Sequence, residues 1–139
     1  MVRVLSILAL TLALAACGNP PPRPEPAGQQ ARDAMDKAAA DYDTCVRNAA
    51  EAIDIAPMKS GDLQAGTAAT ALIKGCVAER VALIAKVLDV RRIGYPKEIP
   101  SVSQSVAEQS VDAIEGELRE RAVTTIVSRQ VDAPAQAAK

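Results

Sequence analysis

The sequence predicts an all-α protein, either a three-helix bundle or a disulfide-stapled helical hairpin with a third helix packed against it. Three stretches of the 139-residue chain repeat apolar residues at spacings of three and four, as an amphipathic helix does. Prolines and glycines fall between these stretches, where they favour turns. No stretch alternates apolar and polar residues as a half-buried strand would, and no internal repeat is present.

Residues 1–16 have the composition of a secretory signal peptide. Arg3 supplies a positive charge, and Val4 to Ala16 is an apolar run of thirteen residues interrupted only by Ser6 and Thr11. As a helix this run would be about 20 Å long, whereas the hydrocarbon core of a bilayer is roughly 30 Å thick. No basic stop-transfer flank follows the run. We therefore expect a signal peptide that is removed, rather than a membrane span.

The apolar run ends in Leu14-Ala15-Ala16-Cys17, which resembles the lipobox of bacterial lipoproteins. In that class a diacylglyceryl group is attached to the lipobox cysteine, the chain is cut before it, and the new N-terminus is acylated, commonly with palmitate. The resemblance implies that Cys17 is the first mature residue and carries the membrane anchor. Gly18 stands where an Asp would favour the inner membrane, so the resemblance also implies the outer membrane, facing the periplasm.

Residues 17–28 are expected to form a linker between the anchor and a helical domain at 29–132. Five prolines lie between Asn19 and Ala27, and such a density favours an extended polyproline II spacer of roughly 28 Å. A ligand for a proline-recognition domain is the alternative, but a spacer is the commoner role beside a lipid anchor.

The first helix is expected from Gln30 to Ala56, where Pro57 ends it because a proline ring clashes with the preceding turn. Met58 to Gly61 then forms a short connection. The apolar stripe of this helix is Met35, Ala38, Ala39, Tyr42, Cys45, Val46, Ala49, Ala52, Ile53 and Ala56.

The second helix is expected from Asp62, as N-cap, to Arg92, with Gly94 at the position after the helix and Pro96 preventing continuation. Its apolar arc is wide enough to touch two neighbours, which predicts that it is the central element. One flank of the arc holds Leu72, Cys76, Leu83, Val87 and Val90, and the other holds Ile73, Val77, Val81, Ile84 and Leu88.

The third helix is expected to start with a capping box of Ser101 and Gln104 and to end near Arg129. Its apolar stripe is Ala107, Val111, Ile114, Leu118, Ala122 and Ile126. The charged residues Glu115, Glu117, Arg119, Glu120 and Arg121 are expected to form a solvated face. Residues 133–139 are expected to form a flexible tail.

Two cysteines remain if Cys17 carries lipid, and we expect Cys45 and Cys76 to form a disulfide. The envelope outside the inner membrane is oxidising, and two antiparallel helices joined by a turn near residue 60 place these residues opposite each other. A redox-active pair is the alternative, but no Cys-x-x-Cys motif is present. The same register predicts an ion pair between Asp41 and Arg80 that fixes the alignment of the helices, the alternative being that Arg80 extends to solvent.

The composition argues against an enzyme, a cofactor site and a metal site. The chain has no His, Phe or Trp, so it lacks the commonest general base and metal ligand. A net charge of −1 without a basic block, and the near absence of aromatic stacking platforms, argue against nucleic-acid binding. Asp41-Tyr42-Asp43 looks like the start of a calcium loop but lacks the later glycine and the terminal Glu.

The sequence therefore predicts a non-enzymatic, lipid-anchored lipoprotein that serves as an interaction or assembly module for an envelope protein partner. The predicted contact surface is the exposed side of the third helix together with the small residues Ala71, Gly75, Ala78, Ala82 and Ala85 of the second. Two alternatives remain: a lipoprotein that binds a small molecule or lipid between loosely packed helices, and an accessory lysis or exclusion lipoprotein of a mobile element.

Overall fold

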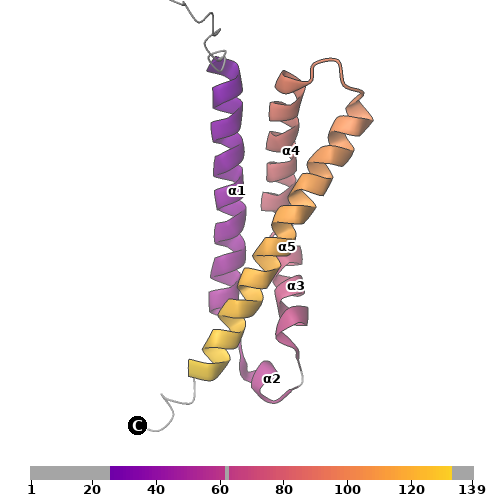
Figure 1. The fold of residues 1–139 in the computed structure, drawn as a ribbon. Helices are drawn as coiled ribbons and strands as arrows, with labels where there is room; N and C mark the ends of the chain where they lie inside the picture. The colour runs from indigo at the N-terminus through magenta and orange to yellow at the C-terminus, as the bar shows by residue number, and fades with distance from the viewer. Residues whose placement is uncertain (1–25, 62, 133–139) are drawn as a thin grey trace, which may run out of the picture.

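The computed structural model describes residues 26–61 and 63–132, and every regular element in this part of the chain is an α-helix. The all-α prediction is confirmed. The elements are α1 (Pro26–Ala52), α2 (Ala56–Lys59), α3 (Ala65–Gly75), α4 (Val77–Gly94) and α5 (Pro100–Asp132), as Figure 1 shows.

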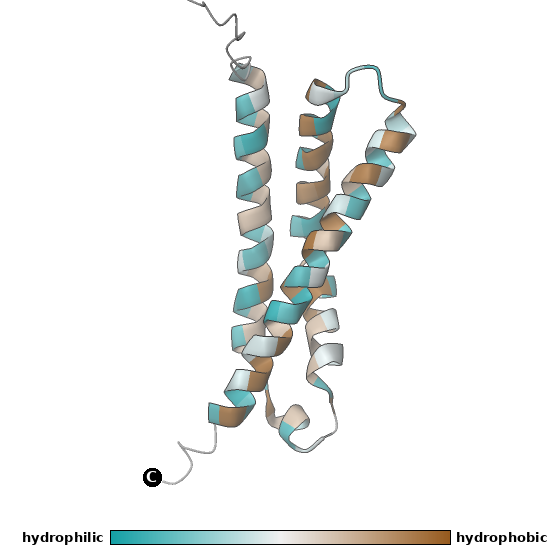
Figure 2. Ribbon diagram, viewed as in Figure 1, coloured by the Kyte–Doolittle hydropathy of each residue, from teal (hydrophilic) through white to brown (hydrophobic). Residues whose placement is uncertain are grey.

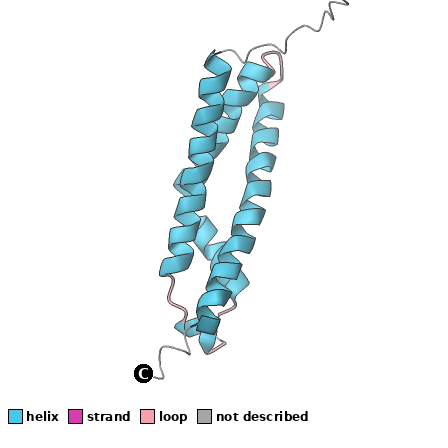
Figure 3. Cartoon of the chain, turned by 60° about the vertical axis from the view of Figure 1, so that its left-hand side comes forward, coloured by secondary structure: helices cyan, strands magenta, loops and turns pink. Residues whose placement is uncertain are grey.

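Three arms make up an elongated bundle: α1, the successive helices α3 and α4, and α5 (Figures 1 and 3). α1 packs chiefly on α4, whereas α3 packs chiefly on α5. α5 crosses obliquely from the upper end of α4 to the lower end of α1 (Figure 1). α4 contacts both α1 and α5, as its wide apolar arc predicts, but α1 and α5 also contact each other, so α4 is not the single central element. Val77 and Val81, which were expected on that arc, are exposed instead.

The first helix begins and ends four residues earlier than the predicted Gln30 to Ala56. It starts at Pro26, inside the expected linker of residues 17–28, because proline is well suited to a first helical turn that needs no N–H donor. It ends at Ala52, and Pro57 lies in the first turn of the short helix α2 instead of ending α1. The side chain of Asp54 accepts a hydrogen bond from the Ala56 N–H at 2.9 Å, which supports the start of α2.

The second predicted helix is interrupted at Cys76, where α3 ends and α4 begins. Gly75 precedes the interruption, and glycine weakens a helix by about 1 kcal/mol relative to alanine. α3 begins at Ala65 with Gln64 as its N-cap, so the N-cap predicted at Asp62 is wrong, and residue 62 itself lies outside the described residues.

Gly94 and Gly61 both lie at helix ends, but only Gly61 adopts the left-handed backbone conformation. Gly94 is the last residue of α4 rather than the residue beyond it. Gly61, just after α2, has a φ of +84°, in the left-handed region that glycine adopts without steric cost. The tight turn between α2 and α3 therefore depends on Gly61.

The capping box predicted for the third helix is not formed. The amide of Gln104 donates to Glu108 at 2.6 Å instead of reaching back to the start of α5. The hydroxyl of Ser103 is buried and donates to Glu98 at 2.6 Å. α5 extends to Asp132, three residues beyond the predicted end.

The core runs along the inner sides of the three arms and is built from small and medium-sized side chains. Its largest fully buried side chains are Tyr42, Val46, Leu83, Val111, Leu118 and Ile126. Buried alanines fill much of the remainder, so the helices approach one another closely and bury little area for each residue. Figure 2 shows the apolar residues of α4 beside the alternating polar and apolar residues of α1 and α5.

None of the helices in the described part combines the length and apolar character needed to cross a membrane. The predicted signal peptide at 1–16, the lipidation site Cys17 and the tail at 133–139 lie outside the described residues.

Candidate functional site

The predicted disulfide is present between Cys45 of α1 and Cys76, the residue between α3 and α4. Their Cα atoms are 6.1 Å apart, and Cys76 is buried against the core. The bond joins the first arm to the second at the point where the second arm changes from one packing partner to the other. Cys45 and Cys76 therefore hold the hairpin of the first two arms in register.

A carboxylate, Glu79, lies near both sulfur atoms, and the three side chains together have the residue types of a metal site. The two sulfurs are bonded to each other, so neither is the thiolate that a metal ion requires. With the disulfide formed, this cluster is a covalent crosslink with an acidic neighbour.

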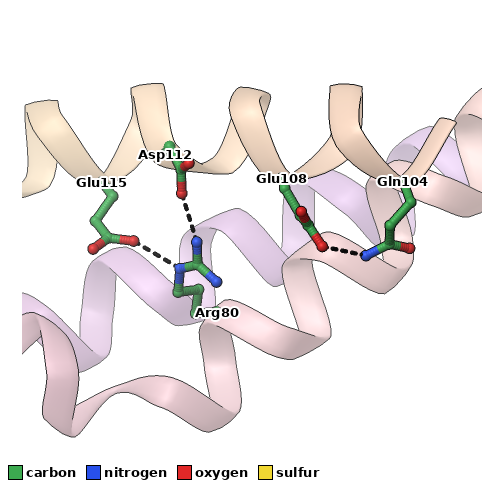
Figure 4. Close-up of polar contacts among 5 residues, drawn as sticks. All are labelled: Arg80, Gln104, Glu108, Asp112 and Glu115. Atoms are coloured by element: carbon green, nitrogen blue, oxygen red, sulfur yellow. Dashed lines mark hydrogen bonds and ion pairs between the residues drawn. The ribbon is translucent and has the colours of Figure 1, made fainter. Parts of the chain in front are cut away.

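Arg80 of α4 is the centre of a polar cluster between α4 and α5 (Figure 4). Its Nη2 donates to Asp112 at 2.5 Å and its Nε donates to Glu115 at 2.8 Å. Asp112 and Glu115 are three residues apart on α5, so one turn of that helix presents both carboxylates to a single guanidinium. The hydrogen bond that Arg80 donates to Glu115, followed by the one it donates to Asp112, raises the pKa of Arg80.

The predicted ion pair between Asp41 and Arg80 is wrong. Asp41 is exposed on α1 and pairs with Lys37 on its own helix at 2.7 Å, while Arg80 is turned toward α5. The predicted pair was based on the two hairpin helices alone, with Asp41 of α1 as the carboxylate partner of Arg80. In the structure α5 supplies two carboxylate partners instead, Asp112 and Glu115. Glu115 was likewise expected on a solvated face, but it is half-buried and pairs with Arg80.

Tyr42 lies in the core beside this cluster and is fully buried. Its hydroxyl makes no hydrogen bond of good geometry among the described residues, although the charges of Glu115 and Arg80 act on it. Burial, followed by the negative charge of Glu115, raises the pKa of Tyr42 to about 12. Tyr42 is therefore protonated and uncharged at neutral pH.

A second ion pair closes the turn between α4 and α5. Arg91 donates two hydrogen bonds of 2.6 Å to Glu98, and Ser103 adds a third from α5. The hydrogen bonds from Arg91 and then Ser103 lower the pKa of Glu98, and the bond to Glu98 raises the pKa of Arg91. The guanidinium of Arg91 also lies 4.8 Å from the centre of the Tyr95 ring, which fixes that ring beside the turn.

α5 is also joined to α1 by two arginines. Arg121 pairs with Asp43 at 2.9 Å. Arg129 donates to the carbonyls of Ala50 and Ile53 at 3.0 and 2.9 Å, which satisfies carbonyl groups that the end of α1 leaves free. Charged contacts thus hold α5 at both ends and near its middle, and sequence spacing gave no signal of them because they depend on how α5 crosses the bundle.

The outward face of α4 is apolar. Every exposed residue between Val77 and Leu88 is valine or alanine, and Val77 and Val81 are each 58% exposed. The ionisable residues of this stretch, Glu79, Arg80 and Lys86, are partly buried instead. The five small residues predicted to form a contact surface are all exposed: Ala71, Gly75, Ala78, Ala82 and Ala85. We call the exposed residues Val77, Ala78, Val81, Ala82 and Ala85 the α4 face.

The hollows in the described part of the chain have linings that mix polar and apolar residues. The largest, of about 880 Å³, lies between α3 and α5 and is lined by Gln64, Thr67, Thr70, Lys74, Arg119 and Glu120 among others. A smaller one of about 320 Å³ lies between α1 and α5, with Asp43, Arg47 and Arg121 around Val46 and Leu118. A third hollow, of about 260 Å³, lies between the start of α1 and the end of α4, and its lining is mainly apolar, with Met35, Val87 and Val90 among its residues.

Comparison with known proteins gave no match to a protein-family model, to a curated protein or to a solved structure.

Proposed function

We propose that this chain is a non-enzymatic lipoprotein, anchored in the bacterial envelope by a lipid on Cys17, whose helical domain acts as an interaction or assembly module. The α4 face is the observation that carries this proposal. It leaves two large valines in water on a helix whose other side already contacts α1 and α5. An outward face whose exposed residues are all valine and alanine is typical of a contact site, since solvated helix faces are usually polar.

The proposed partner is an apolar helix of another envelope protein. Small residues such as Ala78, Ala82 and Ala85 allow a second helix to approach closely. The α4 face runs from Val77 to Ala85, about 13 Å along the helix axis, which is enough for one helix crossing. A contact of this size buries less than the roughly 800 Å² that each partner of a stable soluble complex buries. A partner held at the same membrane would offset this small area, because tethering raises the effective concentration.

The ligand-binding alternative has less support, because the two hollows of about 880 and 320 Å³ carry several charged side chains, and the mainly apolar one holds only about 260 Å³, which is small for a ligand site. The geometry offers no specific observation in favour of an accessory product of a mobile element.

Site-specific photocrosslinking in the native envelope tests the proposed module. A photoreactive residue at Ala78 or Ala82 should give one defined adduct whose crosslinked peptide comes from an apolar helix of a different protein. The same residue at Asp36, which is exposed on α1, is the matched control and should not give that adduct. Adducts only to phospholipid, only to a second copy, or equally at Asp36 would refute the proposed partner. Mass spectrometry of the mature protein tests the anchor separately, through the acyl mass on Cys17.

A further inference from the structure

The end of the bundle where α4 turns into α5 carries a cluster of exposed apolar side chains. We call residues 92–102 the tip. Four of the eight large exposed hydrophobic residues of the described part lie in it or at its edge, namely Ile93, Tyr95, Ile99 and Val102. The other four are on the α4 face or at the far end of α5. The tip is therefore an apolar surface separate from the α4 face.

Positive charge surrounds this apolar cluster. Arg92 and Lys97 are exposed, and Arg32 of α1 is exposed nearby, where it lines the same hollow as Ile93 and Tyr95. The acidic groups are mostly engaged: Glu98 is held by Arg91 and Ser103, and Asp89 lies between Lys86 and Arg92. α5 carries no acidic residue before Glu108, although Asp33 is exposed on α1.

The chain enters the bundle at this same end. α1 begins beside the tip, since a Cβ on Gly28 would lie 3.8 Å from the side chain of Ile93. Figures 1 and 3 both show the start of α1 and the α4–α5 connection at one end of the molecule. Cys17 precedes Pro26 by nine residues, which span at most about 32 Å. A lipid on Cys17 would therefore hold the tip within about 30 Å of the bilayer.

We propose that the tip docks on an anionic phospholipid surface, with Ile93, Tyr95, Ile99 and Val102 at the level of the headgroups and Arg92 and Lys97 beside lipid phosphates. Tyrosine is well suited to this interface because its ring is apolar and its hydroxyl stays hydrated. The contact between Arg91 and Tyr95 fixes the ring at the edge of the tip. Each cation near such a surface adds only a small attraction, so the tip acts with the anchor rather than in place of it.

This inference rests on the proposed lipid anchor, and the experiment separates the two by supplying the tether chemically. With Cys45 and Cys76 joined, Cys17 is the free thiol of a chain from residue 17 to 139. Removing residues 1–16 takes away none of the buried core, which lies between Ala38 and Ile126. Coupling Cys17 to a maleimide lipid in vesicles gives a tethered protein whether or not the cell acylates that cysteine.

The readout is quenching of Tyr95 fluorescence by brominated acyl chains, with a Tyr95→Phe sample supplying the background from the buried Tyr42. In vesicles of phosphatidylcholine and phosphatidylglycerol, we expect the Tyr95 signal to fall at least about twofold, and to fall less in phosphatidylcholine alone. Ile99→Asp should largely restore the signal. The matched control is Val131→Asp at the opposite end of α5, because Val131 is 68% exposed and Ile99 is 65% exposed. This control should leave the quenching unchanged.

The proposal is overturned if Tyr95 is unquenched on the anionic vesicles, if neutral vesicles quench it equally, or if Val131→Asp restores the signal as much as Ile99→Asp does. A tip that docks when tethered chemically, in a protein that lacks acyl groups in its native host, would refute the anchor and leave the tip's affinity for lipid standing. An acylated protein whose Tyr95 is unquenched would refute docking of the tip and leave the lipid anchor standing.

Discussion

Breaking the Cys45–Cys76 disulfide should be the most destabilising single chemical change that leaves the side chains of the core in place. The bond closes a loop with a sequence separation of 31 residues. In the chain-entropy account, a crosslink over a loop of this length reduces the entropy of the unfolded chain enough to stabilise the fold by about 3.7 kcal/mol at 25 °C. Alanine is the commonest residue of the buried core, so this contribution is large relative to a typical total of about 5–15 kcal/mol.

The measurement is urea unfolding of a Cys17→Ser chain, followed by helical circular dichroism with and without a reductant. With Cys17 replaced, the Cys45–Cys76 disulfide is the only bond between cysteines that the reductant can break. We expect reduction to lower the free energy of unfolding by about 3–4 kcal/mol, and the midpoint of thermal unfolding by about 15 °C for a domain of this size. The double variant Cys45→Ala, Cys76→Ala should behave like the reduced protein.

A loss below about 1 kcal/mol would refute the reasoning, because it would mean that the unfolded chain is not constrained by the loop or that the packing of α1 on α4 sets the register alone. Complete unfolding on reduction, with the helical signal lost at neutral pH, would instead show that the small-residue core cannot hold the domain without the crosslink.

Two further predictions concern the polar cluster between α4 and α5. Arg80→Met should lower the free energy of unfolding by about 1–2 kcal/mol, because it leaves the carboxylates of Asp112 and Glu115 without a cation. Asp41→Ala should lower it by under about 0.5 kcal/mol, because Asp41 is exposed. Equal losses for the two variants in urea titrations would contradict the pairing of Arg80 with α5. The raised pKa of Tyr42 implies stability that is complete below its ordinary pKa of 10.0 and is lost as the pH rises through about 12. The free energy of unfolding should therefore fall more steeply between pH 10 and 12 for the native chain than for Tyr42→Phe. An equally steep fall for Tyr42→Phe would count against the buried phenol as the cause of the pH dependence.

The register of the first two arms was predictable because it depends on local information. A short turn between antiparallel helices fixes which residues face each other, so the spacing of Cys45 and Cys76 was enough to predict their bond. The apolar stripes also predicted most of the core, including Tyr42, Leu83 and Leu118. The exposure of the small residues on α3 and α4 followed from the same helical periodicity.

The partners of Arg80 were not predictable in this way, because they depend on the angle at which α5 crosses the hairpin. Asp112 and Glu115 are two of many charged residues on α5. Their position along the bundle axis places them opposite Arg80, and that position is set by how α5 packs. The interruption at Cys76 had one weak signal, the glycine before it, since no proline marks the position. Pro57 was misplaced because proline is compatible with the first turn of a helix as well as with the end of one.

The α4 face gives the clearest physical reason for assigning this domain a partner. Val77 and Val81 leave more than half of their surface in water, so they gain little from the hydrophobic effect, and valine is a weaker helix former than lysine or glutamate. Charged residues at the same positions would therefore serve an isolated domain better, in helix stability and in solubility. The tip is different, because its apolar residues alternate with Arg92 and Lys97 and lie where the chain leads toward Cys17. One surface without charge and one with positive charge fit two different neighbours, so a variant that weakens the contact at Val81 should leave the lipid contact at Ile99 unchanged.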